Sequence, residues 1–303
     1  MEKQWIIKPV PDAQKVKKLA SDLEVDEIIA ILLLQRGIET KTEALKFFNP
    51  DLKDLFDPFE MDGMYAAIRR IESAIDKNEK ILVYGDYDVD GTTSVAMVYS
   101  FLARFHNNLD YYIPERYNEG YGVSYKGIDY AHSTGATLII ALDCGIKAVE
   151  KINYAREKGI DFIICDHHLP GDTIPDAVAV LNPKKANCKY PFKELSGCGV
   201  GFKMLQGYCL HKGIDMQVLY EYLDMVAVSI ASDIVPITGE NRILACHGLK
   251  KLNSNPSEGL KAIKKTAKIE GVEININDIV FKIGPRINAA GRIRKGKIGR
   301  AHV

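Results

Sequence analysis

The sequence predicts an α/β fold in which a mainly parallel β-sheet is flanked by helices, with a helical N-terminal cap and a helical C-terminal part. Short apolar runs alternate with segments of helical periodicity between residues 80 and 181, an order typical of parallel sheets with crossover helices. The run from Leu138 to Leu142 is apolar at every position, which indicates a strand covered on both faces. Residues 1–75 carry Lys, Glu and Leu at helical spacing, and residues 199–267 are also predominantly helical in pattern.

The predicted elements follow these runs along the chain. The strands are residues 80–84, 109–113, 136–142, 161–165 and 177–181, and the helices between them are residues 92–105, 126–132 and 146–158. We therefore divide the chain into a helical N-terminal cap (1–75), an α/β domain (76–240) and a helical region (241–303).

The composition is that of a globular protein: 47% of the 303 residues are hydrophobic and 26% are charged. The longest apolar stretch near the start, residues 28–34, is too short to span a bilayer, and no cleavable leader pattern precedes it. We expect a cytoplasmic protein without a membrane segment. Six cysteines without a CxxC pair argue against a zinc knuckle and a disulfide framework.

The charge is balanced overall but uneven along the chain. Forty basic and forty acidic residues give a net charge of zero, so no strongly basic field attracts nucleic acid to the whole protein. From Lys282 onward, however, there are seven Lys or Arg and no Asp or Glu. This segment is either a solvated tail or a strip that faces phosphates.

Acidic and histidine residues follow the ends of the predicted apolar segments. Because ligand sites of parallel sheets lie beyond the carboxyl ends of the strands, these residues should meet there. Three carboxylates at alternate positions in Gly85–Gly91 repel one another unless cations neutralise them. The four clusters are Asp86, Asp88 and Asp90; Asp143; Asp166, His167 and His168; and Asp233.

This donor set predicts a metal site. A single Asp after a strand is most often a helix cap or turn former, but capping does not require acids and imidazoles from four separate segments to converge. Carboxylate oxygens with a few imidazoles suit Mn²⁺ or Mg²⁺ better than thiolate-seeking metals. We expect two ions.

Other side chains are candidates for substrate binding. Guanidinium and amide groups in a glycine-containing segment could clamp a phosphate, or the segment is a hinge with solvated charges. Tyrosine rings could line a strand-entry groove and stack on unpaired bases, although core packing explains them equally well. These candidates are Arg286, Asn288 and Arg292, and Tyr121 with Arg116. Lys203 either faces phosphate or is a surface lysine.

The ordered motifs resemble those of the DHH phosphoesterase superfamily, and its RecJ branch fits best. The four clusters carry the resemblance, together with Ile113–Gly122, Leu195–Gly201 and Gly284–Arg292. The resemblance covers roughly residues 75–292 and is highly specific in its order.

The resemblance implies a two-metal nuclease that degrades single-stranded DNA from the 5′ end to 5′-mononucleotides, in DNA repair and recombination. It implies Asp88, Asp90, Asp143, His167 and Asp233 as metal ligands. The phosphatase branch has a His where this chain has Tyr84. Tyrosine is a poor metal ligand at neutral pH, so Asp86 is expected to coordinate the ion in its place. Proteins of the RecJ branch continue into a downstream substrate-binding domain, so residues 241–303 would lead toward it, and this shorter chain could be inactive. Single-strand-binding protein or helicase partners are possible for the longer form.

The chemistry leaves one role open and two alternatives. His168, beside Asp166, either orients the cage or protonates the leaving oxygen, as a group titrating near neutrality can. The same cage could instead hydrolyse short oligonucleotides or cyclic dinucleotides. A scaffold that binds single strands without catalysis is the non-enzymatic alternative, and it would be expected to have lost some of the ligands.

Overall fold

The computed structural model describes residues 6–293, without the side chains of residues 290–293, and divides the chain into two compact units. The first unit is Met1–Asp54 and the second is Leu55–Val303. This division falls before the predicted boundary at residue 75, and the boundaries at 75 and 240 remain predictions.

The first unit is helical, as its sequence predicts. Each of its three α-helices begins at a residue whose side chain accepts a backbone N–H bond, the usual way to satisfy free donors at a helix start. At Thr40 this bond is part of a capping box with Glu43. Buried Leu19, Ala30 and Leu33 belong to the small core between the helices. The elements are α1 (Ala13–Leu23), α2 (Glu27–Leu34), α3 (Lys41–Phe48) and the 3-10 turn η1 (Leu52–Asp54).

The second unit contains the predicted parallel sheet. Five strands pair in the order β2-β1-β3-β4-β5, and each pair is parallel. The strands are β1 (Lys80–Gly85), β2 (Leu109–Tyr112), β3 (Ala136–Leu142), β4 (Asp161–Cys165) and β5 (Ala179–Leu181). β3 is buried at six of its seven positions, as expected for a strand covered on both faces. The prediction of a mainly parallel sheet with flanking helices is therefore confirmed.

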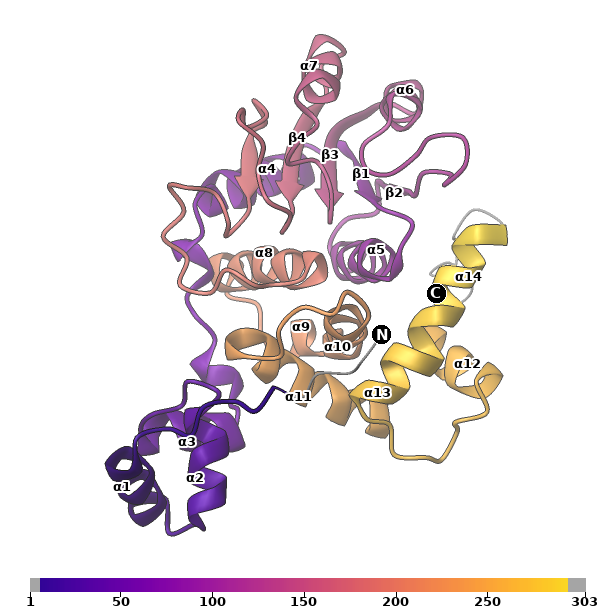
Figure 1. The fold of residues 1–303 in the computed structure, drawn as a ribbon. Helices are drawn as coiled ribbons and strands as arrows, with labels where there is room; N and C mark the ends of the chain where they lie inside the picture. Colours follow the sequence, from indigo (N-terminus) through magenta and orange to yellow (C-terminus); the bar gives the residue numbers. More distant parts are fainter. Residues whose placement is uncertain (1–5, 294–303) are drawn as a thin grey trace. The chain divides into compact units, whose positions relative to one another are not determined.

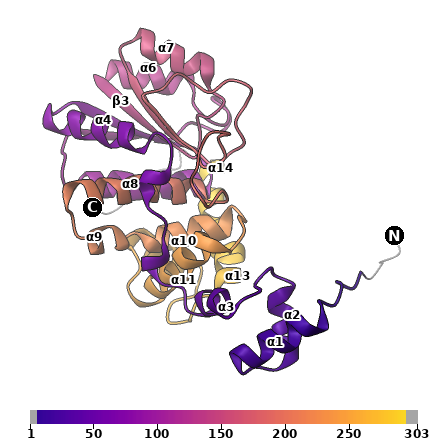
Figure 2. The same ribbon diagram turned by 90° about the vertical axis from the view of Figure 1, so that its left-hand side faces the viewer.

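Helices cover both faces of the sheet. In Figure 1, α6 (Tyr125–Ser133) and α7 (Val149–Glu157) lie on one face, and α5 (Val89–Leu102) and α8 (Gly197–Lys212) lie on the other. Figure 2 shows α6 and α7 on the opposite side of the sheet from α8 in a second view. α4 (Met64–Asp76), which follows the 3-10 turn η2 (Pro58–Glu60), contacts α8 and β5. The core under α6 and α7 includes Tyr84, Ile139 and Phe162.

A further layer of helices packs against α5 and α8, as the helical pattern after residue 199 predicts. α10 (Leu223–Ser232) contacts both of these helices, and α11 (Gly239–Ser254) contacts α10. Val89 of α5 shares a buried apolar cluster with Val228 of α10 and Ile287. The remaining elements are α9 (Gln217–Tyr220), α12 (Glu258–Thr266), α13 (Ile276–Asp278), the π-helical turn η3 (Ile279–Ile283) and α14 (Gly284–Ile293). Within residues 6–293, no helix combines the length and apolar character needed to cross a bilayer.

A buried ion pair joins α8 to α11. Lys203 Nζ lies 3.1 Å from Glu240 Oε1, and both side chains are fully buried. Lys203 also donates to the carbonyl of Phe56 at 2.6 Å, and Tyr190 donates to Glu240 Oε2 at 2.6 Å. Both readings of Lys203 from sequence are therefore wrong: it faces neither phosphate nor solvent, because Glu240 lies within reach of its charge in the interior.

Replacing Lys203 by Met should lower the free energy of unfolding by about 3–5 kcal/mol, because Glu240 would be left as an uncompensated buried charge. Urea unfolding measures this change. The matched control is Lys212→Met, which breaks the half-exposed pair of Lys212 with Glu72 and should cost less than about 1 kcal/mol. Equal losses in the two variants would contradict the role assigned to the buried pair.

Candidate functional site

The predicted acidic and histidine residues lie at the carboxyl edge of the sheet. Asp86 follows β1, Asp143 follows β3, and Asp166, His167 and His168 follow β4. β1, β3 and β4 are adjacent, so these residues leave the sheet side by side. The chain passes from β1 to β2 on one side and to β3 on the other, and such a reversal is where parallel sheets bind ligands.

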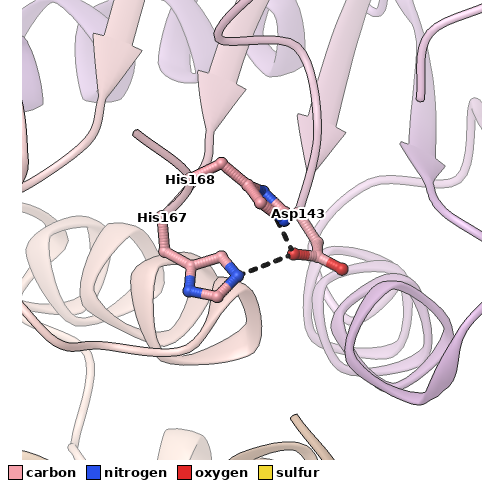
Figure 3. Close-up of side chains that lie close together, drawn as sticks. All are labelled: Asp143, His167 and His168. Carbon is pink, nitrogen blue, oxygen red and sulfur yellow. Dashed lines mark ion pairs between the residues drawn. The ribbon is translucent and has the colours of Figure 1, made fainter. Parts of the chain in front are cut away.

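Asp143 and His167 form the centre of the site. Asp143 Oδ1 lies 3.2 Å from His167 Nε2 and 4.0 Å from His168 Nδ1, as Figure 3 shows. Asp143 is 1% exposed and has a φ of 59°, a backbone conformation uncommon outside glycine. Within the described residues, both oxygens of Asp143 and both ring nitrogens of His167 are buried without a hydrogen bond of good geometry. Buried polar atoms without partners are rare, and a missing ion is one explanation for them.

His167 also connects Asp143 to two further acids. Its Nε2 lies 3.5 Å from Asp233 Oδ2 and 3.8 Å from Asp90 Oδ2. Two overlapping groups result, Asp143–His167–His168 and Asp90–His167–Asp233, and the ligand atoms of each lie within 4.8 Å of one another. Residues from four separate segments are thus close enough to hold cations.

Asp88 lies at the edge of this cluster. As the N-cap of α5, it accepts from the N–H of Gly91 at 2.9 Å through Oδ1. Its other oxygen, Oδ2, is 3.5 Å from the hydroxyl of Tyr121. Burial, and then the negative charge of Asp90, raises the pKa of Asp88.

Asp86 and Tyr84 together hold the loop that follows β2. Asp86 Oδ2 accepts from the N–H of Gly122 at 2.6 Å, and Oδ1 accepts from the N–H of Tyr87 at 2.7 Å. The buried Tyr84 hydroxyl donates to the carbonyl of Gly122 at 2.9 Å and accepts from the N–H of Ser124 at 3.1 Å. Asp86 belongs to neither of the two groups around His167, and its role as a metal ligand stays a prediction.

Asp166 holds the backbone of both histidines and the ring of His168. Its Oδ1 accepts from the N–H groups of His167 and His168 and from His168 Nδ1, the last at 2.8 Å. Its Oδ2 accepts from the N–H of Ile146 at 2.9 Å. Burial alone would raise the pKa of Asp166, but the bond from His168 and the backbone donors lower it below its usual value. The same bond raises the pKa of His168.

The crowded acids disfavour their own ionised forms. Burial, and then the charges of Asp90 and Asp88, raises the pKa of Asp143 well above normal and that of Asp233 to about 7. Burial is also the largest cause that raises the pKa of Asp86 to about 7. Burial lowers the pKa of His167 and so favours its neutral, ligating form. The site as a whole has an excess of negative charge that cations would neutralise.

Two predicted substrate-binding residues lie beside the cluster. The ring of Tyr121 packs edge-on against His168, with centroids 6.1 Å apart, and against Tyr87 at 5.7 Å. The guanidinium of Arg116 lies 5.1 Å from the centre of the Tyr87 ring. Arg116, Tyr87, Tyr121 and His168 therefore form a continuous row of contacting groups, with the rings packed edge to face, that ends at the site.

The predicted substrate-binding residues of α14 are described only in part. The exposed Arg286 donates to the carbonyl of Lys282 at 2.6 Å, and no described interaction joins it to the acidic cluster. Asn288 is partly buried in the same helix. The side chain of Arg292 and the basic residues from 294 onward lie outside the described part of the chain.

Three groups that donate hydrogen bonds to the Asp90 carboxylate were not predicted from the sequence. The N–H groups of Gly197 and Cys198, at the start of α8, donate to its two oxygens at 2.7 Å each, and Ser229 donates to Oδ1 at 2.8 Å. A Cβ on Gly197 would lie 2.6 Å from Asp143 Oδ1. The glycine-rich segment after Ser196 is a sequence signal for a helix start that approaches another group closely. No sequence signal identifies its partner, because Asp90 is 107 residues away.

Comparison with known proteins identifies relatives of this chain. Residues 80–230 match the DHH family, N-terminal domain. The single-stranded-DNA-specific exonuclease RecJ of Bacillus subtilis is 40% identical over 285 residues, which are 94% of this chain and 36% of that protein. The RecJ of Escherichia coli is 34% identical over 287 residues, 91% of this chain and 49% of that protein. The chain thus spans between about a third and half of the length of these relatives.

Solved structures show the same fold. A crystal structure of exonuclease RecJ bound to manganese matches with a TM-score of 0.73 and 31% identity over 82% of this chain and 62% of that one. RecJ from Thermus thermophilus in complex with Mn²⁺ matches with a TM-score of 0.80 and 28% identity, over 96% of this chain and 41% of that one.

The raised pKa values predict how the stability of the metal-free protein depends on pH. Asp86 and Asp233 keep their protons up to about pH 7 when folded but only up to about pH 4 when unfolded. Between these values the unfolded state binds fewer protons, so their contribution to stability falls as pH rises. We expect the thermal midpoint in EDTA to be lower at pH 7.5 than at pH 5, and Asp233→Asn to reduce the difference. A midpoint that rises over this range would contradict the prediction.

Proposed function

Residues 80–230 make this chain a member of the DHH family, and from that premise we propose that it is a two-metal phosphodiesterase that degrades single-stranded DNA 5′→3′ to 5′-mononucleotides. The observation that carries the proposal is the pair Asp143 and His167. Their four buried polar atoms make no hydrogen bond of good geometry within the described residues, and such atoms are costly unless a ligand engages them. A scaffold without metals would have no use for them.

The residues of the site fit divalent cations. Asp88, Asp90, Asp143, His167 and Asp233 would hold the ions, and oxygen donors with one imidazole suit Mn²⁺ or Mg²⁺. Relatives of known structure are described as bound to manganese or in complex with Mn²⁺ or Mg²⁺. When bound, two such ions supply a hydroxide nucleophile at neutral pH and neutralise charge on the scissile phosphate.

His168 is placed to give a proton to the leaving oxygen. Asp166 can only accept, so the 2.8 Å contact keeps a proton on His168 Nδ1, and Nε2 is the nitrogen left for exchange. The side chain of His168 is 42% exposed, which leaves room for a substrate oxygen. The bond to Asp166 raises the pKa of His168 and so favours the imidazolium form that a general acid needs.

The row of aromatic groups and the guanidinium beside the site suits a single strand. Tyr121 touches both His168 and Tyr87, and Arg116 covers Tyr87. Aromatic faces accept any unpaired base, and an adjacent guanidinium attracts the backbone phosphates. Arg286, Asn288 and Arg292 on α14 are proposed to bind phosphate.

The first experiment is Mn²⁺-dependent digestion of single-stranded DNA labelled at either end. We expect labelled mononucleotides to appear first from the 5′-labelled strand, and long strands to be degraded as well as short ones. Asp143→Asn should lower the rate by about a hundredfold or more, because several kcal/mol of transition-state stabilisation depend on the ions. The same assay on a longer form of the protein measures what the downstream part contributes. Equal rates for wild type and Asp143→Asn in the longer form would contradict the proposal.

A second prediction concerns the close contact behind Asp143. Gly197→Ala should weaken Mn²⁺ binding by about tenfold or more, because the new Cβ would collide with the Asp143 carboxylate at 2.6 Å. Titration followed by electron paramagnetic resonance of free Mn²⁺ measures this. Gly201→Ala on the same helix is the control, since its Cβ would meet the flexible ends of Leu142 and Met97 at 3.3 and 3.5 Å. Unchanged Mn²⁺ binding by Gly197→Ala would show that the contact is not needed.

A further inference from the structure

Asp90 is held by three hydrogen-bond donors from two other elements. Gly197 N–H donates to Oδ2 at 2.7 Å, and Cys198 N–H donates to Oδ1 at 2.7 Å. Both belong to the first turn of α8, where free N–H groups favour a negative charge. Ser229 of α10 donates to Oδ1 at 2.8 Å. Asp90 is 2% exposed, so water does not compete with these bonds.

These three hydrogen bonds leave one lone-pair position of the Asp90 carboxylate free. A carboxylate has about four lone-pair positions, and Oδ1 uses both of its own for Cys198 and Ser229. Oδ2 uses one for Gly197. The remaining position is on Oδ2, the oxygen that lies 3.8 Å from His167 Nε2 and belongs to the group with Asp233.

Ser229 is itself held by a second serine. Ser229 Oγ lies 2.7 Å from the Oγ of Ser196, the N-cap of α8, and both side chains are fully buried. Ser229 has one hydroxyl proton and donates it in the hydrogen bond to the Asp90 carboxylate. In the contact between the two hydroxyls, Ser196 is therefore the donor. Ser196 in turn accepts from the N–H of Gly199 at 3.1 Å. The chain of bonds runs from α8 through α10 to Asp90.

Ser229 and Asp233 lie four residues apart along the same stretch of helix, Asp233 being the C-cap of α10. Residues at this spacing lie on the same helix face. We infer that Ser229, backed by Ser196, is a positioning residue that fixes Asp90 as a one-oxygen ligand at a set distance from Asp233. The inference rests on the proposed two-metal function. It says that the two serines affect the ion held by the Asp90–His167–Asp233 group, through their hold on the Asp90 carboxylate.

Ser94 offers a matched comparison. It is also fully buried and lies one turn after Asp90, but its hydroxyl donates to the backbone carbonyl of Asp90 at 2.7 Å. Ser94→Ala and Ser229→Ala therefore each remove one buried hydroxyl that bonds to the same residue. Only Ser229→Ala removes a bond to the carboxylate.

The experiment measures Mn²⁺ binding to the full chain by electron paramagnetic resonance and calorimetry, with the thermal midpoint in EDTA as the measure of folding. We expect wild type to bind two ions. Ser229→Ala should weaken one of them by about 10–100-fold, the usual effect of losing a partner of a metal ligand, and leave the other unchanged. Ser196→Ala should weaken the same ion less. Ser94→Ala should lower the midpoint about as much as Ser229→Ala and leave both affinities unchanged.

The outcomes separate this inference from the proposed function. If Ser229→Ala binds both ions as wild type does, or if Ser94→Ala weakens binding equally, the positioning role is wrong and the two-metal function stands. If wild type binds no Mn²⁺ in the full chain or in a longer form, the proposed function fails and the inference fails with it.

Discussion

The electrostatic repulsion between several carboxylates placed near one buried imidazole is the constraint on which the rest of the site depends. Asp90, Asp143 and Asp233 surround His167 at 3.2–3.8 Å, and like charges at such distances disfavour one another's ionisation. The protein offsets part of this cost with fixed dipoles: the start of α8 faces Asp90, and backbone N–H groups face Asp86 and Asp166. Both oxygens of Asp143 are buried without such a donor within the described residues. The remaining negative charge is therefore concentrated where cations would be held.

The acids of the site differ in how many lone pairs their hydrogen bonds leave free. Asp166, whose two oxygens accept four hydrogen bonds, acts as a fixed part of the scaffold, whereas Asp90 accepts three and keeps one lone pair free. A carboxylate with free lone pairs is available to a ligand. Asp86 accepts two backbone N–H groups and Asp143 accepts none within the described residues, although both directly follow central strands and both are buried.

The sequence predicted the strands and the edge where the acids meet, because these depend on local apolar runs and on the rule for parallel sheets. It predicted the five strands within one or two residues at each end. It could not assign Lys203, whose position beside Glu240 depends on how α8 and α11 pack. Nor could it find Ser229, because nothing in a helical serine indicates that its partner is a carboxylate 139 residues earlier. The motif spacing indicated which residues meet, whereas hydrogen-bond partners depend on tertiary packing.

The two hydrogen bonds that hold Gly122 fix the loop carrying Tyr121 to β1, the strand that is followed by three of the acids. Tyr84 and Asp86, which hold the Gly122 carbonyl and N–H, stand at the end of β1, and Asp88 and Asp90 follow within four residues. The loop that contains Tyr121 is thus attached to the end of the same strand after which Asp86, Asp88 and Asp90 follow. The position of Tyr121 relative to Asp88 and Asp90 therefore depends on a few covalent and hydrogen bonds. If the proposed function is right, this short connection would keep a constant spacing between the residues that contact the strand and the residues that hold the ions, as removal of one nucleotide per cycle requires.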